Sequence, residues 1–149
     1  MALRIAINGF GRIGRNLFRI LHDREDIRIG AICDPAEPEA LEYLIRFDTV
    51  LGRFPEAVSI RDGVLRVSGR QIPVLTGSRA NTMPWNELGI HTVLEATSRS
   101  RSRAELSRHL EAGARRVLSL APPADPPDLL AVPGITDDRV ESRQRLVSN

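Results

Sequence analysis

The chain contains no lysine, and all 21 basic residues among its 149 are arginine. Without an ammonium side chain it has neither a Schiff-base lysine nor the lysine of a phosphate-binding P-loop. The single cysteine excludes an intrachain disulfide, and the net charge is only +2. Acidic residues are interspersed among the arginines of 99–116. We therefore expect these arginines on a solvated helix face and predict no nucleic-acid partner.

Long hydrophobic runs are also missing, since no apolar stretch approaches the ~20 residues that cross a bilayer. Met1 is followed directly by a segment with the pattern of a strand rather than by a signal peptide. With a single cysteine as well, we expect a cytoplasmic protein with no membrane partner. The three histidines and the cysteine show no metal-ligand spacing, so no metal site is predicted.

A glycine motif is the most informative feature among the residues that are present. An apolar run over 3–8 leads into Gly9-Phe10-Gly11-Arg12-Ile13-Gly14. Gly9 permits a tight turn out of a strand, Gly11 lets a pyrophosphate approach the backbone, and Gly14 lets a following helix press against the sheet. That helix, predicted over 12–21, would direct its N–H groups and positive dipole end at the phosphates. The alternative is that the glycines serve strand–helix packing alone.

An acidic residue stands where such a motif requires one. The segment 27–33 has the pattern of a second strand, and it ends at Asp34, twenty positions after Gly14. A carboxylate there accepts hydrogen bonds from both hydroxyls of an adenosine ribose and repels a 2′-phosphate. The sequence therefore predicts dinucleotide binding, with NAD favoured over NADP.

The remaining elements alternate between strands and helices, which predicts one α/β domain. We expect a Rossmann-like fold with a mostly parallel twisted sheet, helices on both faces and a small antiparallel excursion near residues 57–75, which has a hairpin turn at Asp62-Gly63. The helix over 37–45 has an apolar stripe of Leu41, Leu44 and Ile45, and 47–54 is predicted to be a loop. Further strands are expected at 92–96, 116–120, 129–132 and 146–148, with a helix over 102–112.

The sequence resembles the phosphorylating glyceraldehyde-3-phosphate dehydrogenases and their erythrose-4-phosphate relatives. Four stretches carry the likeness, namely 7–15, 43–54, 84–89 and 109–114, and the resemblance covers the whole chain in order. It implies that residues 1–149 form an NAD-binding domain. It also implies cofactor contacts from residues of the glycine turn, three later strand ends and a segment near the adenine: Asn8, Gly9, Gly11, Arg12, Ile13, Gly14, Asp34, Arg79, Thr97 and Leu120.

The resemblance further implies that the catalytic domain is absent from this chain. In the family, the stretch matching 147–149 leads immediately into the catalytic cysteine motif. We therefore expect the NAD-binding domain of an oxidoreductase that oxidises an aldehyde with hydride transfer to NAD, without catalytic residues of its own. The alternative is a stand-alone, non-enzymatic nucleotide-binding or docking module. Either could form a homo-oligomer or associate with a full-length family member.

Departures from the family pattern gather near the nicotinamide end. Ser98 and Ser100 replace a usual glycine and aromatic residue, and Leu120 replaces a serine. The sequence thus predicts a well-kept adenosine half-site and an altered nicotinamide half-site. Among other candidates, Cys33 is predicted to be a buried structural thiol rather than a nucleophile. His109 is predicted to be an exposed or packing residue rather than a general base.

Overall fold

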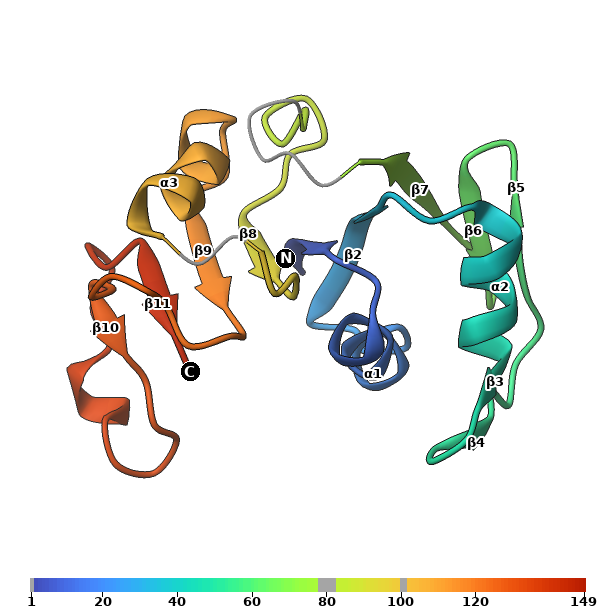
Figure 1. The fold of residues 1–149 in the computed structure, drawn as a ribbon, viewed down its shortest axis with the longest axis horizontal. Helices are drawn as coiled ribbons and strands as arrows, with labels where there is room; N and C mark the ends of the chain where they lie inside the picture. Colours follow the sequence, from blue (N-terminus) through green and yellow to red (C-terminus); the bar gives the residue numbers. More distant parts are fainter. Residues whose placement is uncertain (1, 78–82, 100–101) are drawn as a thin grey trace.

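The computed structural model describes residues 2–77, 83–99 and 102–149, and these form a nine-stranded sheet with helices on both faces (Figure 1). The strand order is β10-β11-β9-β8-β1-β2-β7-β6-β5. The central strands are β1 (Leu3–Asn8), β2 (Ile27–Asp34), β8 (Thr92–Glu95) and β9 (Arg116–Ser119). The others are β5 (Val58–Arg61), β6 (Val64–Val67), β7 (Arg70–Thr76), β10 (Leu129–Leu130) and β11 (Leu146–Ser148).

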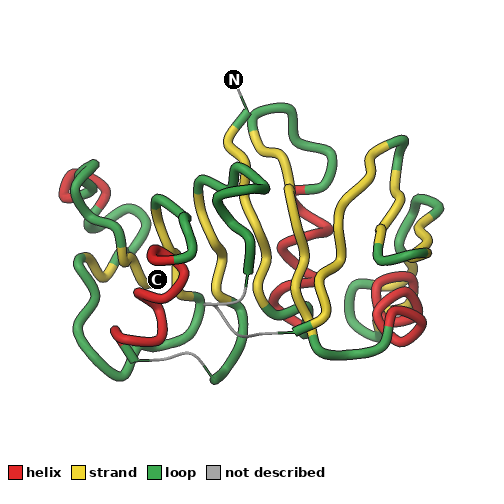
Figure 2. The backbone as a smooth tube through the Cα atoms, turned by 90° about the horizontal axis from the view of Figure 1, so that it is seen from above, coloured by secondary structure: helices red, strands yellow, loops and turns green. Residues whose placement is uncertain are grey.

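Every strand pair from β10 across to β7 is parallel, and Figure 2 shows these strands side by side through the molecule. The central strand β1 is nearly continuous in apolar residues because helices and loops cover it on both sides. Its carboxyl end, Asn8, lies in register with Glu95 of β8 and Cys33 of β2. The α/β fold with a mostly parallel sheet is confirmed.

The helices α1 (Arg12–Leu21) and α3 (Arg103–Glu111) lie on opposite faces of the sheet (Figure 1). Phe18 of α1 packs in one cluster with Ile5 and Ile7 of β1, whereas Leu106 of α3 packs with Val117 of β9. The boundaries of α3 follow from local chemistry. Ser102 and Glu105 form a reciprocal capping box at its start, and a glycine with φ of +106° follows its C-cap.

The antiparallel excursion continues the main sheet. Asp62 and Gly63 both have positive φ, as a two-residue hairpin between β5 and β6 requires. The strand β7 pairs antiparallel with β6 and parallel with β2, so the excursion joins the parallel part through a shared strand. The helix α2 (Pro38–Arg46) packs against β5, where the Glu42 carboxylate accepts the Ile60 N–H at 2.9 Å.

Two details of the prediction for this region are wrong. The segment 47–54 is not a loop, because β3 (Phe47–Asp48) and β4 (Gly52–Arg53) pair as a small antiparallel hairpin. The Asp48 carboxylate closes its turn by accepting two backbone N–H bonds, from Val50 and Leu51. Leu44 is exposed rather than part of a buried stripe, since it lies on the flank of the helix face that buries Leu41 and Ile45.

No helix among the described residues is both long enough and apolar enough to span a membrane.

Candidate functional site

The candidate site lies at the carboxyl edge of the parallel sheet, where β1, β2 and β8 end side by side. Parallel strands bring their carboxyl ends to one edge, and this is where open α/β sheets bind ligands. A hollow of about 240 Å³ opens there. Its lining comes from the glycine turn and the two neighbouring strand ends, and comprises Gly9, Gly11, Asp34, Pro35, Ala96, Thr97, Ser98 and Arg99.

The three glycines of the turn differ in what surrounds them. Gly9 has φ of +93°, and a Cβ there would lie 2.8 Å from Cγ2 of Thr97. A Cβ at Gly14 would lie 2.1 Å from the carbonyl oxygen of Gly9. A Cβ at Gly11, by contrast, would meet nothing within 4 Å. The fold therefore requires glycine at positions 9 and 14, whereas at position 11 it leaves open backbone beside the hollow.

The N-terminus of α1 is available to an anion. Gly11 is its N-cap, and among the described residues no side chain caps the helix start. The first N–H groups of a helix have no intrahelical partner, and they carry the positive end of the dipole. Arg12 and Ile13, the first two helical residues, are exposed. Their backbone N–H groups can therefore bind phosphate oxygens.

The Asp34 carboxylate is held in place beside this turn. One oxygen accepts the Phe10 N–H at 2.7 Å, and the other accepts the Ala36 N–H at 2.9 Å. Two carboxylate oxygens offer about four acceptor positions in total, so both keep capacity for further donors. The side chain is only partly buried, and it lines the hollow. A fixed, accessible carboxylate of this kind suits a ribose diol.

Glu95 is a buried carboxylate that we did not predict as a site residue, and it organises the side of the hollow opposite Asp34. Oε2 of Glu95 accepts a hydrogen bond from Nδ2 of Asn8 at 2.7 Å. Oε1 of Glu95 accepts one from the Thr97 N–H at 2.9 Å, and a short one from the Thr97 hydroxyl. Asn8 and Glu95 are both fully buried. Oδ1 of Asn8 accepts no hydrogen bond from any described residue, so it remains an acceptor at the end of β1.

The same carboxylate extends this network into the protein core. Nε2 of His109 lies 2.8 Å from Oε2 of Glu95, and Nδ1 of His109 accepts the Trp85 indole N–H at 3.0 Å. With Nδ1 accepting, the proton of a neutral ring sits on Nε2 and faces the carboxylate. His109 is therefore the packing residue that the sequence allowed rather than an exposed one. The available signal for Glu95 was a charged residue closing the buried run Thr-Val-Leu.

The remaining predicted residues have different positions. Leu120 follows β9 and donates its N–H to the Glu95 carbonyl at 3.0 Å, but its side chain packs against the core cluster of α1 rather than lining the hollow. Ser98 is exposed and does line the hollow. Arg79 and Ser100 lie outside the described residues. The structure thus brings Gly9, Gly11, Asp34 and Thr97 together at the hollow, whereas Asn8 is fully buried at the end of β1 and does not line it.

Cys33 is the buried thiol that the sequence predicted. It lies on β2 and packs in one cluster with Trp85 and with Val93 of β8. Burial, with smaller contributions from Glu95 and Asp34, raises the pKa of the thiol to about 12. A thiol of this kind stays protonated near neutral pH and is a poor nucleophile. Among the described residues, no group of three potential ligands could hold a metal ion.

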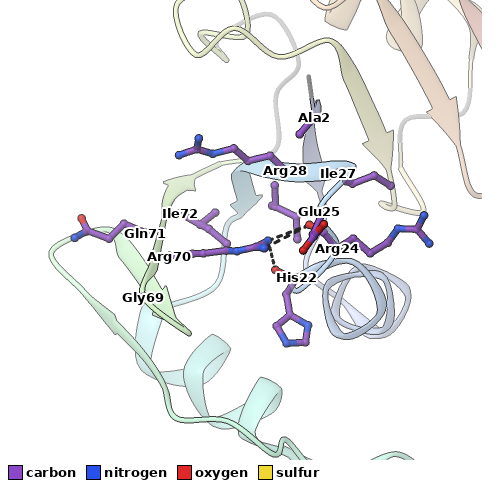
Figure 3. Close-up of a pocket in the computed structure, with 11 residues that line it drawn as sticks. Ala2, His22, Arg24, Glu25, Ile27, Arg28, Gly69, Arg70, Gln71 and Ile72 are labelled. Carbon is purple, nitrogen blue, oxygen red and sulfur yellow. Dashed lines mark hydrogen bonds between the residues drawn. The ribbon is translucent and has the colours of Figure 1, made fainter.

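A second hollow, of about 590 Å³, lies at the other end of the sheet near the start of β2 (Figure 3). Arg70 of β7 enters it and donates hydrogen bonds to the backbone carbonyls of His22, Asp23 and Arg24. These carbonyls lie just beyond the C-terminus of α1, where a cation complements the helix dipole. The Arg70 guanidinium is thus engaged in holding α1 against the antiparallel strands.

Comparison with known proteins places the site in a family. The family model described as glyceraldehyde 3-phosphate dehydrogenase, NAD binding domain, matches residues 3–103. The glyceraldehyde-3-phosphate dehydrogenase of Mycobacterium leprae is 39% identical over 158 residues, covering 100% of this chain and 46% of that protein. The enzyme of Kitasatospora aureofaciens is 43% identical over 148 residues, which cover 98% of this chain and 44% of that protein. The enzyme of Geobacillus stearothermophilus is 36% identical over 150 residues, which cover 100% of this chain and 44% of that protein.

The chain therefore spans less than half the length of these curated relatives. The family match extends from β1 through the glycine turn, Asp34 and Thr97 to the start of α3, and so includes the whole hollow. Because this match covers more than half of the chain, the chain belongs to the family of NAD-binding domains of glyceraldehyde-3-phosphate dehydrogenases.

Proposed function

We propose that residues 1–149 form a domain that binds NAD chiefly through its adenosine and pyrophosphate portions. The open backbone at Gly11, beside an α1 N-terminus that no described side chain caps, carries this proposal. The fold does not require glycine there, whereas a pyrophosphate approaching the helix does. The proposed contact residues are those of the turn and the strand ends, with Arg79 added from the resemblance alone: Asn8, Gly9, Gly11, Arg12, Ile13, Gly14, Asp34, Arg79, Thr97 and Leu120.

Selectivity for NAD over NADP follows from Asp34. Both of its oxygens are held by backbone N–H bonds, so the carboxylate cannot easily rotate away from a bound ribose. A 2′-phosphate would meet this fixed negative charge, whereas a 2′-hydroxyl would donate a hydrogen bond to it. We therefore propose that NADP binds much more weakly than NAD.

The activity of the whole protein is a further proposal. The relatives are named as glyceraldehyde-3-phosphate dehydrogenases, and they are more than twice as long as this chain. We infer that this domain serves an oxidoreductase that oxidises an aldehyde with hydride transfer to NAD, while the catalytic nucleophile comes from outside residues 1–149. Cys33 does not fill that role, because its thiol is buried and its pKa is raised to about 12. A cytoplasmic location and a homo-oligomer, or association with a full-length family member, complete this proposal.

A second candidate is a non-enzymatic module that binds an adenine nucleotide. The observation that favours it is the nicotinamide end of the site, where Ser98 is exposed at the hollow and the Leu120 side chain packs elsewhere. In that case the nicotinamide portion contributes nothing to binding, and an adenosine ligand without it binds equally well.

Isothermal titration of the purified chain with NAD, ADP-ribose and NADP tests these proposals together. We expect NAD to bind and NADP to bind at least about tenfold more weakly, which corresponds to the loss of one charge-assisted hydrogen bond. Equal affinities for NAD and ADP-ribose would favour the adenine-nucleotide module, and tighter binding of NAD would favour the oxidoreductase domain. Failure of all three ligands to bind would refute nucleotide binding and leave the glycine turn a packing device.

A further inference from the structure

Glu95 accepts hydrogen bonds from Asn8 and Thr97, at the ends of two strands beside the nucleotide hollow, but it does not itself reach the hollow. Its side chain is fully buried, and it does not line the hollow. Four hydrogen-bond donors from described residues point at its two oxygens, two at each. Nδ2 of Asn8 and Nε2 of His109 lie at Oε2, and the N–H and hydroxyl of Thr97 lie at Oε1.

The two bonds at Oε1 determine where Thr97 lies, and Thr97 in turn confines the glycine turn. Cγ2 and the backbone nitrogen of Thr97 approach Gly9 so closely that a Cβ at Gly9 would lie 2.8 and 2.9 Å from them. Gly9 and Thr97 both line the hollow. A shift of Thr97 would therefore move the wall of the hollow and release the turn that leads into α1.

The bonds at Oε2 fix the orientation of the Asn8 amide. Because Nδ2 donates to Glu95, Oδ1 is the atom left without a partner among the described residues. An unpaired acceptor that is fully buried is costly unless a donor reaches it. Asn8, like Glu95, is fully buried and does not line the hollow, so its amide supports the start of the glycine turn from within the protein. Glu95 thus orients a second group next to the site besides Thr97.

A carboxylate is favoured because each of its oxygens faces a donor that cannot become an acceptor, the Thr97 N–H at Oε1 and Nε2 of His109 at Oε2. The Thr97 hydroxyl and a turned Asn8 amide can accept, but a glutamine NH₂ group would still face one of these two fixed donors whichever way it turned. His109 cannot relieve this conflict by moving its proton to Nδ1, because Nδ1 accepts the Trp85 indole N–H at 3.0 Å. The network therefore tolerates only a residue that accepts at both positions.

We infer that Glu95 is a positioning residue of the dinucleotide site, acting through Thr97 and Asn8 rather than by contact with the ligand. This inference rests on the proposed binding of NAD. Part of the binding affinity then comes from a buried carboxylate at the end of β8 that does not line the hollow. His109 and Trp85 belong to the same network, because they keep the carboxylate in the one orientation that serves both strand ends.

Titration of Glu95→Gln with NAD tests the inference, with Glu42→Gln as its matched control. Glu42 also accepts a backbone N–H and an arginine, but it does so between α2 and β5. Circular dichroism and the emission of Trp85, the only tryptophan, establish that each variant is folded at the temperature of the titration. We expect the dissociation constant for NAD to rise about tenfold in Glu95→Gln and to change by less than about twofold in Glu42→Gln.

A second pair of variants gives an answer even if Glu95→Gln does not fold. Thr97→Val keeps the Cγ2 contact and removes the hydroxyl bond to Glu95, whereas Thr97→Ser keeps the hydroxyl. We expect weaker NAD binding in the valine variant and a substantial return of affinity in the serine variant. Unchanged affinity in folded Glu95→Gln, or in Thr97→Val, would overturn the positioning role while leaving NAD binding intact. Failure of the unmodified chain to bind NAD would overturn the proposed function, and the inference with it.

Discussion

The Asp34 carboxylate accepts the backbone N–H of Phe10 at 2.7 Å, and this bond joins the end of β2 to the glycine turn that follows β1. Phe10 itself is buried, in edge-to-face contact with Phe18 of α1. The carboxylate is therefore tied through Phe10 to the helix whose N-terminus faces the hollow. Two parts of the proposed nucleotide site, the ribose acceptor and the phosphate turn, are held as one unit.

Replacement of Asp34 should weaken binding and change its selectivity. In Asp34→Asn the amide NH₂ replaces one of two oxygens that both accept backbone N–H bonds, and the negative charge is lost. We expect affinity for NAD and ADP-ribose to fall by roughly tenfold or more, and affinity for NADP to fall less because the repulsion is removed. Isothermal titration measures all three. Asp26→Asn, at an exposed carboxylate paired with Arg24, is the control. An unchanged ratio of NAD to NADP affinity would contradict this role.

The two glycines at positions 11 and 14 should separate binding from stability. Gly14→Ala puts a Cβ 2.1 Å from the Gly9 carbonyl oxygen, so we expect a loss of about 3 kcal/mol in the free energy of unfolding. Gly11→Ala meets no atom within 4 Å and should cost at most about 1 kcal/mol, as alanine is a poor N-cap. It should nevertheless abolish most NAD binding. Urea unfolding and titration give the two quantities, and full affinity in Gly11→Ala would exclude close approach of a phosphate.

The features that the sequence predicted correctly are those that local pattern determines. The helix over 12–21 and the strand ending at Asp34 lie as expected, because glycine spacing and an apolar run act within a few residues. The hairpin of β3 and β4 was missed, since strands of two residues have no periodicity to detect. Its turn depends on the Asp48 side chain instead.

The Glu95 network was missed for a different reason. Apart from Thr97, its members come from β1, β8, α3 and the segment that contains Trp85, and their hydrogen bonds join residues 14 to 87 positions apart. No local pattern states which buried polar groups will meet, because the packing of α3 on the sheet brings His109 to Glu95. A buried glutamate at a strand end can only signal that partners must exist.

Arg70 should stabilise the contact between α1 and the antiparallel strands. Its guanidinium donates to the carbonyls of His22 and Arg24 just beyond the helix (Figure 3), and also to that of Asp23. Arg70→Ala leaves these carbonyls without that donor, and we expect a loss of about 1 kcal/mol in the free energy of unfolding. Arg66→Ala is the control, because that exposed side chain makes only one long bond of 3.5 Å. Equal unfolding midpoints for the two variants would show that Arg70 does not cap the helix.

Asp128 should make the C-terminal strands sensitive to acid. Its carboxylate accepts the N–H groups of Arg145 and Leu146 at 2.8 and 2.9 Å and pairs with Arg103 of α3 at 2.5 Å. Partial burial raises the pKa of this carboxyl, but the bonds from Leu146, Arg103 and Arg145 outweigh it and bring the pKa to about 2, below the ordinary 3.8. The stabilisation is therefore complete above about pH 4, and it is lost as the pH falls toward 2.

Asp128→Asn tests this dependence. We expect the variant to be less stable than the unmodified chain at pH 7, by about 1 kcal/mol after allowance for solvent screening at this partly exposed carboxylate. The difference should shrink between about pH 4 and pH 2, because protonation there removes the same charge from the unmodified chain. Asp138→Asn, at an exposed carboxylate of the short helix η2 (Asp137–Arg139), should show neither effect. Urea unfolding across this pH range measures both, and a difference that stays constant down to pH 2 would mean that the Asp128 charge does not stabilise the C-terminal strands.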